Sequence, residues 1–531
     1  MEASEPKPFL TVDNITVRLG DKLILRNSSW QIKTNEHWAI LGPNGSGKST
    51  LVRSLWGGAP LRSGSILFDF AGSEPLTDPF SFRGAVGYVS FETHQRLMEY
   101  EEQQEEFRAY APQERSSTVR DIIFSGILGH RTLTGTDRER LAPVAALLDI
   151  RDILERSVIT LSSGEIRKTL IARALMKSPR LLILDEPFDG LDEKARRSLA
   201  ASIDRLMAGS LRVILVAHRI EEIGPQITHL LFVKNGRIFR QGTKEELLTS
   251  PSVSELYDCP LQVKKNHSQY SISFDSQSGT GLDLLASSEA TAPEILIAMK
   301  EATVKYGDRV ALDRFTWEMK RGENWAILGP NGSGKSTILR LILGDHLQGY
   351  ANPIWLFGKR RGSGETLWEI KKHIGVVSPE FQVQYRKKMS SHDVIASGFF
   401  DSIGLYQYPT REQKAAVDEW VERLKLEDIA KDPYDQLSYG QKRMILLARA
   451  MVKRPVLLIL DEPCHGLDIP NRKRILEIIE KIGRNKTHLL YVTHQAAEIL
   501  DCITHILHLS RGKVLGQGKK NGCPGETPVF A

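Results

Sequence analysis

Short runs of continuous apolar residues recur along this chain, and each ends abruptly in glycine or in acidic residues. Trp38–Leu41 and Trp325–Leu328 lead into glycine-rich loops, and residues 181–184 and 457–460, both Leu-Leu-Ile-Leu, lead into Asp-Glu. Unbroken apolar runs of this length are typical of strands buried on both faces of a parallel sheet. The pattern predicts an α/β fold, with the acidic pairs at the carboxyl ends of central strands, where ligands bind in such sheets.

Two other patterns accompany these strands in each half of the chain. Residues 9–34 are β-rich and alternate, and residues 302–310 repeat the pattern of residues 15–23, which predicts an antiparallel sub-sheet in each half. Residues 166–176 and 442–452 have the spacing of amphipathic helices, within a less regular, mainly helical region. We therefore expect two tandem domains, each with a mainly parallel core sheet, an antiparallel β sub-sheet and a helical subdomain.

One thirteen-residue string, WAILGPNGSGKST, occurs at residues 38–50 and again at 325–337. Each copy contains G-x-x-x-x-G-K-S between a predicted strand and a predicted helix, which is the setting that a phosphate-binding loop requires. Glycines let backbone N–H groups point inward, and the helix N-terminus and the lysine attract phosphate. The residues expected to bind nucleotide are Gly42, Asn44, Gly45, Gly47, Lys48, Ser49, Thr50, Gly329, Asn331, Gly332, Gly334, Lys335, Ser336 and Thr337.

Further motifs follow each loop in the same order. LSSGE at residues 161–165 and LSYGQ at 437–441 precede the amphipathic helices, and a later apolar strand ends in His218 or His494. Alone, an Asp-Glu pair after a strand is often a solvated strand end, and a lone histidine is more often structural than catalytic. Repetition of the whole set in both halves indicates a duplicated nucleotide-binding domain.

Composition narrows the class of protein further. The net charge of +6 over 531 residues is mild, and 41% hydrophobic and 26% charged residues are ordinary for a globular protein. Four scattered cysteines without a C-x-x-C pair argue against a disulfide framework, a zinc site or an iron–sulfur cluster. No run approaches the roughly 18–20 apolar residues of a membrane span. With an acidic N-terminus that lacks an apolar segment, we expect a cytoplasmic protein, or alternatively one of the mitochondrial matrix.

The ordered set of phosphate loop, L-S-x-G-[EQ], Asp-Glu, G-L-D and histidine resembles the ATP-binding cassette (ABC) ATPases, over nearly all of both halves. The resemblance implies a first ATP-binding domain at residues 1–257, a Ser-rich linker at 258–293 and a second ATP-binding domain at 294–531. It also implies ATP hydrolysis with Mg²⁺ as cofactor.

Individual roles follow from the same resemblance. Ser49 and Asp185, and in the second half Ser336 and Asp461, should hold Mg²⁺. The resemblance makes Glu186 and Glu462 the general bases that polarise the attacking water, with His218 and His494 at the γ-phosphate. The two domains should close head to tail over two ATP molecules. Each phosphate loop then faces the other domain's signature residues, which are Ser162, Gly164, Ser438 and Gly440.

The two halves differ at one expected nucleotide contact. Tyr306 can stack on an adenine ring, whereas the matching first-half residue, Leu19, offers only an apolar face. We expect the first site to bind nucleotide more weakly.

The chain also departs from the family pattern. A glutamine that usually touches Mg²⁺ and relays to transmembrane partners is replaced by Phe91 and Pro379, with Gln95 and Gln382 nearby but out of register. This departure argues against ordinary coupling to a transporter.

Within the family, residues 356–375, 344–350 and 400–404 and the EPFDGLD string at 186–192 resemble the ModF-type proteins, which are soluble, tandem and associated with molybdate transport. We therefore expect a soluble tandem ATPase whose domain closure acts on an unidentified protein partner. Two alternatives stay open: a ribosome-associated translation factor of the ABC-F type, which the short, nearly neutral linker disfavours, and the ATP-binding subunit of a membrane transporter. A DNA-repair or chromosome-type ATPase is disfavoured, because such proteins carry long coiled coils or zinc-bearing insertions and this chain has room for neither.

Overall fold

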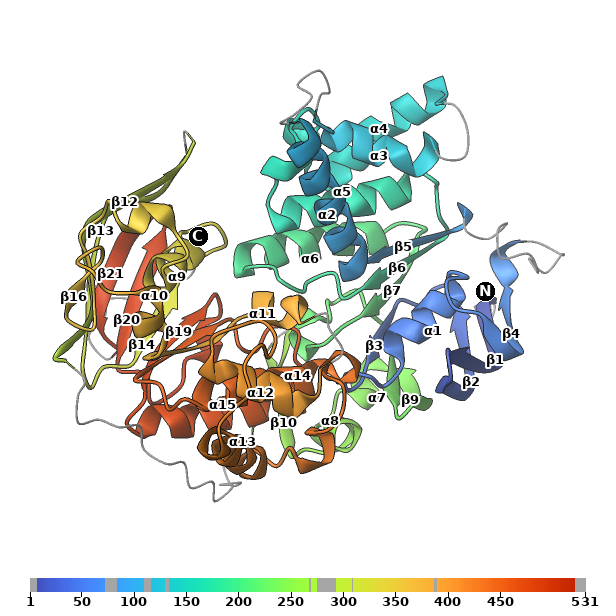
Figure 1. Cartoon of the computed structure of the whole chain (residues 1–531). Coiled ribbons are helices and arrows are strands. Elements are labelled where there is room, and N and C mark those ends of the chain that lie inside the picture. The colour runs from blue at the N-terminus through green and yellow to red at the C-terminus, as the bar shows by residue number, and fades with distance from the viewer. Residues whose placement is uncertain are drawn as a thin grey trace. The chain divides into compact units, whose positions relative to one another are not determined.

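The computed structural model describes residues 7–71, 84–108, 116–128, 133–266, 269–274, 293–307, 309–385 and 389–520. The chain folds as two compact units, Met1–Gln277 and most of Ser278–Ala531. Each unit has its own sheets (Figure 1). Each also has its own hydrophobic core.

A six-stranded sheet forms the centre of the first unit. Its strand order is β5 (Val86–Ser90), β6 (Leu181–Asp185), β7 (Arg212–Val216), β3 (Trp38–Leu41), β8 (His229–Lys234) and β9 (Arg237–Thr243). The first five strands are parallel and β9 pairs antiparallel with β8. Every residue of β3 and β6 is buried, as their unbroken apolar runs predicted. The expected α/β fold is confirmed.

An antiparallel sheet of order β2 (Lys22–Lys33), β1 (Pro8–Leu19) and β4 (Leu61–Phe68) accompanies this core. Its inward side chains, among them Leu10 and Trp30, share one cluster with Leu51 and Leu55 of α1 (Lys48–Leu55). Apolar residues at alternate strand positions reach one face of the sheet, which is why this sub-sheet covers α1. The alternating sequence of residues 9–34 predicted an antiparallel sub-sheet, and the pairing of β1 with β2 confirms this prediction.

A helical cluster completes the first unit and lies next to β5 in Figure 1. It contains α2 (Phe91–Arg108), α3 (Val119–Leu128), α4 (Gly135–Leu147) and α5 (Ser163–Leu175). Three further helices are α6 (Glu193–Met207), α7 (Lys244–Leu247) and α8 (Ser250–Tyr257). Leucine and isoleucine side chains of α3, α4, α5 and α6 pack in one core with the face of the sheet formed by Leu182 and Leu184.

The second unit repeats this plan. Its core sheet has the order β17 (Ile374–Val377), β18 (Leu457–Asp461), β19 (His488–Thr493), β14 (Trp325–Leu328), β20 (His505–Ser510) and β21 (Lys513–Lys519). The antiparallel sheet has the order β13 (Arg309–Lys320), β12 (Ile295–Tyr306), β15 (Ile354–Leu356) and β16 (Lys359–Arg360). The helices are α9 (Lys335–Leu343), α10 (Leu367–Lys371), α11 (Pro379–Gln384), α12 (Ser391–Ala396), α13 (Arg411–Arg423), α14 (Tyr439–Met451) and α15 (Ile469–Arg484).

Residues 258–293 were expected to form a linker, but the first half of this segment contains two paired strands. β10 (Leu261–Asn266) and β11 (Gln269–Phe274) form an antiparallel hairpin. Leu261 and Tyr270 are buried in the core of the first unit, which therefore extends beyond residue 257. Residues 275–292 lie outside the described part of the chain.

No helix within the described ranges is both long and apolar enough to cross a bilayer.

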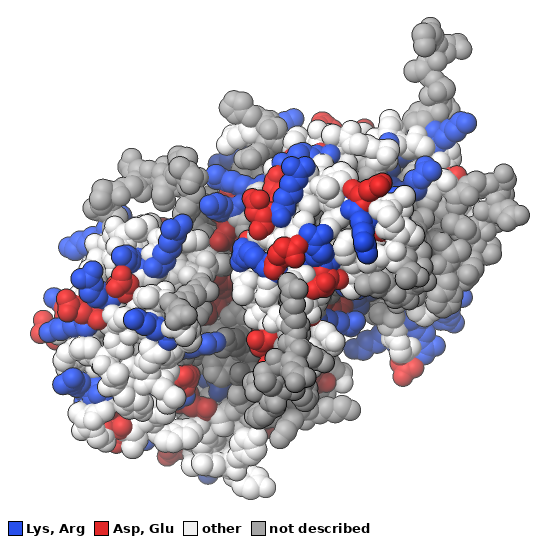
Figure 2. Space-filling model, turned by 90° about the horizontal axis from the view of Figure 1, so that it is seen from above, with Lys and Arg blue, Asp and Glu red and all other residues white. Residues whose placement is uncertain are grey.

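Charge is mixed on the molecular face drawn in Figure 2, where basic and acidic side chains lie interspersed among the described residues. Proteins that bind nucleic-acid backbones carry clustered basic surface. The described residues on this face form no such cluster.

Candidate nucleotide-binding sites

The phosphate loops need glycine for two structural reasons. A Cβ on Gly42 would lie 2.0 Å from the carbonyl oxygen of Val233, and one on Gly329 would lie 2.3 Å from that of Leu509. Gly47, directly before α1, has a left-handed φ of 105°, a conformation that other residues rarely adopt. These glycines let the loop pass close to the neighbouring strand and turn into the helix.

Each phosphate-loop lysine folds back over its own loop. The Lys48 Nζ donates hydrogen bonds to the carbonyl oxygens of Gly42 (2.8 Å) and Pro43 (3.0 Å). The Lys335 Nζ does the same to Gly329 (2.7 Å) and Pro330 (2.9 Å). Burial lowers the pKa of Lys48, and the nearby Glu186 carboxylate opposes this shift. Both ammonium groups therefore lie at the mouth of a loop whose helix N-terminus attracts anions.

The loops also hold unsatisfied polar groups. The hydroxyls of Ser46 and Ser333 are buried and have no hydrogen-bond partner among the described residues. A buried hydroxyl without a partner is costly, and a phosphate oxygen is a suitable acceptor. The donor set therefore fits the phosphates of a nucleotide. The other predicted contacts lie on the same loops or on the first helical turn after them, namely Asn44, Gly45, Thr50, Asn331, Gly332 and Thr337.

Asp185, at the end of β6, is the predicted metal ligand of the first unit. It accepts hydrogen bonds from the hydroxyl of Ser49, 3.2 Å from its Oδ1, and from the hydroxyl of Tyr88, 2.9 Å from its Oδ2. Burial, with the neighbouring charge of Glu186, raises the pKa of Asp185 to about 6. A serine hydroxyl beside a carboxylate is a donor set that suits Mg²⁺ bound with nucleotide phosphates.

Glu186, the predicted general base, is held by His218. The His218 Nε2 lies 2.6 Å from the Glu186 Oε1. Burial alone raises the pKa of Glu186, but the charge and hydrogen bond of His218 outweigh it and lower this pKa to about 2. Burial lowers the pKa of His218, yet the Glu186 carboxylate raises it overall. Glu186 also has a left-handed φ of 55°, which is uncommon for a residue other than glycine.

The second unit repeats this pair with the other ring nitrogen. The His494 Nδ1 lies 2.9 Å from the Glu462 Oε1, and Glu462 has a φ of 44°. Burial raises the pKa of Glu462, but the hydrogen bond and charge of His494 lower it to about 2. Backbone strain repeated at matching acidic residues is a feature of functional sites. Each unit therefore places an ionised, histidine-bound carboxylate one residue after its predicted metal ligand.

A cavity of about 660 Å³ joins three predicted contacts of the second unit, Tyr306, Ser336 and Asp461. The Tyr306 ring is 45% exposed and stands edge-on to His346, with ring centroids 5.3 Å apart. Its first-unit counterpart, Leu19, is 42% exposed. Tyr306 thus has an exposed face on a cavity that is also lined by Ser336 and Asp461, the predicted Mg²⁺ ligands.

The signature residues lie at helix N-termini. Ser162 caps α5 through a reciprocal pair with Glu165, and Ser438 caps α14 in the same way with Gln441. A Cβ on Gly164 would lie 2.9 Å from the Ala195 Cβ, and Gly440 is similarly close to Asn471. The glycines therefore let each signature helix start against the next helix of its own unit. The predicted pairing of these residues with the opposite phosphate loop stays a prediction.

The residues that replace the usual glutamine each begin a helix directly after a strand, Phe91 in α2 and Pro379 in α11. Gln95 is exposed, whereas Gln382 is buried. Sequence reasoning missed Tyr88, which contacts the predicted metal ligand. The sequence signal that could have found Tyr88 is a difference between the two copies, because the second copy has Val376 at the matching position.

Comparison with known proteins identifies the family. The model of the ABC transporter family matches residues 25–189 and 312–465. The Escherichia coli ABC transporter ATP-binding protein ModF is 38% identical over 502 residues, 93% of this chain and 95% of that protein. An ABC transporter ATP-binding protein of Schizosaccharomyces pombe is 28% identical over 93% of this chain and 96% of its own length.

Among solved structures, cbiO1 of Clostridium perfringens, part of the ABC transporter complex cbiONQ, is 25% identical and has a TM-score of 0.38. It covers 47% of this chain, and 94% of its own chain is matched. From the two family matches and the relative that spans nearly the whole chain, this protein belongs to the ABC transporter family as a tandem ATP-binding protein, whose domains are ATPases.

Proposed function

We propose that this chain binds two ATP–Mg²⁺ at a head-to-tail interface of its two units and couples hydrolysis to their closure and reopening. The movement acts on a protein partner that the sequence does not name. The proposal assigns Glu186 and Glu462 as general bases, because both carboxylates are ionised and held one residue beyond the predicted metal ligands.

The observation that carries the proposal is the presence of a Glu–His pair in both units. Glu186 with His218 and Glu462 with His494 each lie at the carboxyl ends of central parallel strands. Because the pair is complete in both units, it supports hydrolysis at both sites. A unit that only bound nucleotide would need the aspartate that holds Mg²⁺, but not the glutamate one residue after it. Bound Mg²⁺ would neutralise charge on the β- and γ-phosphates, with Ser49 and Asp185, or Ser336 and Asp461, as its protein ligands.

The test is steady-state ATPase activity of the full chain and of Glu186→Gln, Glu462→Gln and the double variant. We expect each single change to lower turnover and the double change to lower it at least about a hundredfold, since general-base catalysis contributes about 10²–10⁴ in rate. ATP binding, measured by equilibrium dialysis, should survive in all three variants because glutamine retains the size of the side chain.

Glu245→Gln and Glu422→Gln are matched controls, since both glutamates are exposed and lie outside the predicted sites. Their turnover should equal that of the parent. If the double variant hydrolyses ATP as fast as the parent, the assignment of the bases is wrong. Head-to-tail closure has its own readout: small-angle scattering should show that the ATP-bound double variant is more compact than the nucleotide-free chain.

The name of the family and the names of relatives favour a second candidate, the ATP-binding subunit of a membrane transporter. The ATP-bound double variant distinguishes the two candidates when it is used as bait. Recovery of one integral membrane protein in a fixed ratio supports the transporter subunit, whereas recovery of a partner from the cytoplasmic fraction supports the first proposal. The four cysteines are scattered along the sequence without a C-x-x-C pair, which suits a reducing compartment such as the cytoplasm, or alternatively the mitochondrial matrix.

A further inference from the structure

The loop that follows α9 forms part of the wall of the second nucleotide cavity. His346, Leu347 and Gln348 line this cavity of about 660 Å³ together with Tyr306. Its volume is within the range of about 300–1,000 Å³ that is usual for small-molecule sites. Leu347 is 88% exposed, so an apolar side chain stands at the wall without cover from the rest of the unit. The cavity therefore extends from the predicted Mg²⁺ ligands to a group of ring and apolar side chains.

Side-chain amides fix this loop to strand β12 directly beside Tyr306. The Gln348 Oε1 accepts a hydrogen bond from the Lys305 N–H (3.0 Å), and the Gln348 Nε2 donates to the Lys305 carbonyl oxygen (2.7 Å). Asn352 pairs with Thr303 in the same way, at 2.7 Å and 3.1 Å. Each amide thus takes the place of a neighbouring strand, and the loop is held in register with the end of β12, where Tyr306 is the last residue.

His346 presents a hydrogen-bond donor beside the tyrosine ring. Its ring stands edge-on to that of Tyr306, with an angle of 82° between the planes. The His346 Nδ1 accepts a hydrogen bond from the Gln348 N–H (3.2 Å). Because Nδ1 accepts, the neutral imidazole carries its proton on Nε2. Among the described residues, nothing forms a hydrogen bond with this Nε2. The cavity wall therefore has a fixed N–H donor next to an aromatic face.

The first unit has different residues at the matching positions. Counted from the two phosphate loops, Ala59 stands in the place of His346, and Leu61 in the place of Gln348. Leu61 begins β4 and pairs with Val17 of β1. The first unit therefore secures this region by strand pairing, and it has no imidazole at this position.

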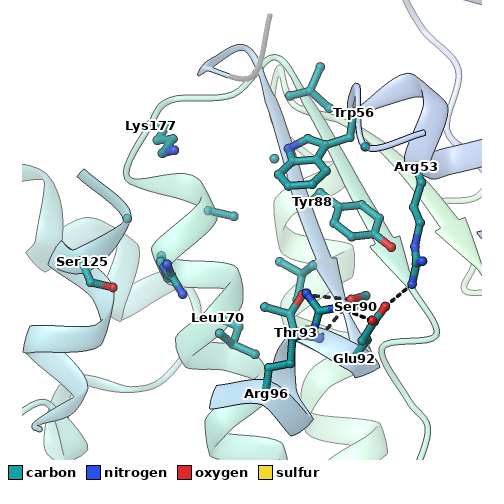
Figure 3. Close-up of a pocket in the computed structure, with 17 residues that line it drawn as sticks. Arg53, Trp56, Tyr88, Ser90, Glu92, Thr93, Arg96, Ser125, Leu170 and Lys177 are labelled. Carbon is teal, nitrogen blue, oxygen red and sulfur yellow. Dashed lines mark hydrogen bonds and ion pairs between the residues drawn. The ribbon is translucent and has the colours of Figure 1, made fainter. Parts of the chain in front are cut away.

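The aromatic residue that follows α1 is directed to another part of the first unit. Trp56 stacks on Tyr88 of β5, with ring centroids 5.2 Å apart (Figure 3). Both rings line a cleft of about 560 Å³, and the described residues around it include neither Leu19 nor Ser49. The combination of a tyrosine ring, an imidazole and a nucleotide cavity is thus a feature of the second unit.

We propose that His346 is a specificity-determining residue of the second nucleotide site, where it binds the purine base together with Tyr306. The inference rests on the proposed function, in which this cavity binds ATP. Tyr306 stacks on the base, and the His346 Nε2–H donates a hydrogen bond to a ring nitrogen of the base. Adenine presents such acceptors at N3 and N7. The first site, with Leu19 and Ala59, binds nucleotide mainly through its phosphates.

The test uses the full chain with Lys48→Ala, which weakens the first phosphate loop, and Glu462→Gln, which stops hydrolysis at the second site. Isothermal titration calorimetry with Mg²⁺ measures the Kd of ATP and of inorganic triphosphate, which has the phosphates but no base. We expect ATP to bind more tightly than triphosphate. His346→Ala should raise the Kd of ATP about tenfold and leave that of triphosphate within about twofold, because the residue contacts the base alone.

Two further variants sharpen this test. His346→Phe keeps a ring beside Tyr306 but has no N–H, so it should raise the Kd of ATP about threefold or more. His373→Ala is the matched control, because His373 is exposed and lies 5.2 Å from the ring of Phe357, outside the residues that line the cavity. Both Kd values of this control should equal those of the parent.

Four results overturn the inference. They are an ATP Kd that His346→Ala leaves unchanged, an equal rise in the Kd of ATP and triphosphate, an unchanged ATP Kd in His346→Phe, and ATP that binds no more tightly than triphosphate. In each case ATP still binds at the second site, so the proposed function stands. A parent protein that does not bind ATP at all would overturn both.

Discussion

The hydroxyl of Tyr88 donates a hydrogen bond of 2.9 Å to the Oδ2 of Asp185, and so ties the predicted metal ligand of the first unit to the neighbouring strand. Tyr88 is on β5, which pairs in parallel with β6. Val376 holds the matching position in the second unit and has no hydroxyl to donate. The two predicted metal sites therefore differ in a contact that orients the carboxylate.

Tyr88→Phe should weaken Mg²⁺ binding at the first site and leave Mg²⁺ binding at the second site unchanged. In a Glu462→Gln background, where only the first site turns over, we expect the Mg²⁺ concentration for half-maximal ATPase activity to rise about tenfold. The physical reason is that partners which orient a metal ligand typically contribute about 10–100-fold in affinity or activity.

The control for this change is Tyr100→Phe, since Tyr100 is 57% exposed on α2. A second control places Tyr88→Phe in the Glu186→Gln background, where the second site alone is active and the Mg²⁺ requirement should not move. An unchanged requirement in the Glu462→Gln background would show that Tyr88 does not position the metal ligand.

Tyr306→Leu should weaken ATP binding at the second site to the level of the first. Tyr306 has an exposed face on the cavity that contains Ser336 and Asp461, and Leu19 offers no ring. Base–aromatic stacking contributes about 1–3 kcal/mol, so the site's Kd for ATP should rise about tenfold. Tyr306→Phe should keep the parent affinity, and Tyr408→Leu, at a fully exposed tyrosine, should do the same. Equal ATP affinities at the two sites of the parent would contradict the predicted weaker first site.

Gly42→Ala should destabilise the first unit. The new Cβ would lie 2.0 Å from the Val233 carbonyl oxygen, which is main chain and has little room to move. Overpacking of this kind costs about 1–3 kcal/mol, measurable by urea denaturation. Gly135→Ala is the matched control, because a Cβ there meets no atom within 4 Å. Equal stability of the two variants would mean that the loop can shift away from β8.

His94 should make the first unit lose stability in mild acid. Burial and the positive charge of Arg167 lower the pKa of His94 to about 4. An unfolded chain has a histidine pKa of about 6.5, so as pH falls below this value the unfolded state takes up a proton that the folded state excludes. Between pH 7 and pH 5 the free energy of unfolding should fall by about 2 kcal/mol from this group.

His94→Gln, which copies Gln382 of the second unit, should remove this part of the pH dependence. The measurement is urea denaturation of parent and variant at both pH values. The same loss of stability in both proteins would show that His94 is already accessible to protons in the folded state.

Most of the architecture could be predicted from local sequence. The runs at Trp38–Leu41 and 181–184 became fully buried parallel strands, because a strand covered on both faces tolerates no polar residue. The hairpin at residues 261–274 was not predicted, since its polar, Ser-rich sequence resembles a linker. What holds it in the first unit is the burial of Leu261 and Tyr270, which is a tertiary contact.

The sequence by itself determined that two nucleotide-binding domains are present, because phosphate loops depend on glycine, lysine and serine at fixed spacing. It also predicted which residues carry the chemistry. Tertiary structure alone decided that Tyr88 reaches Asp185 and that His218 and His494 use different ring nitrogens. It also decided that Gln348 holds the loop after α9 beside Tyr306. These relationships join residues that are far apart in the chain, and their distances depend on how the sheet and helices pack.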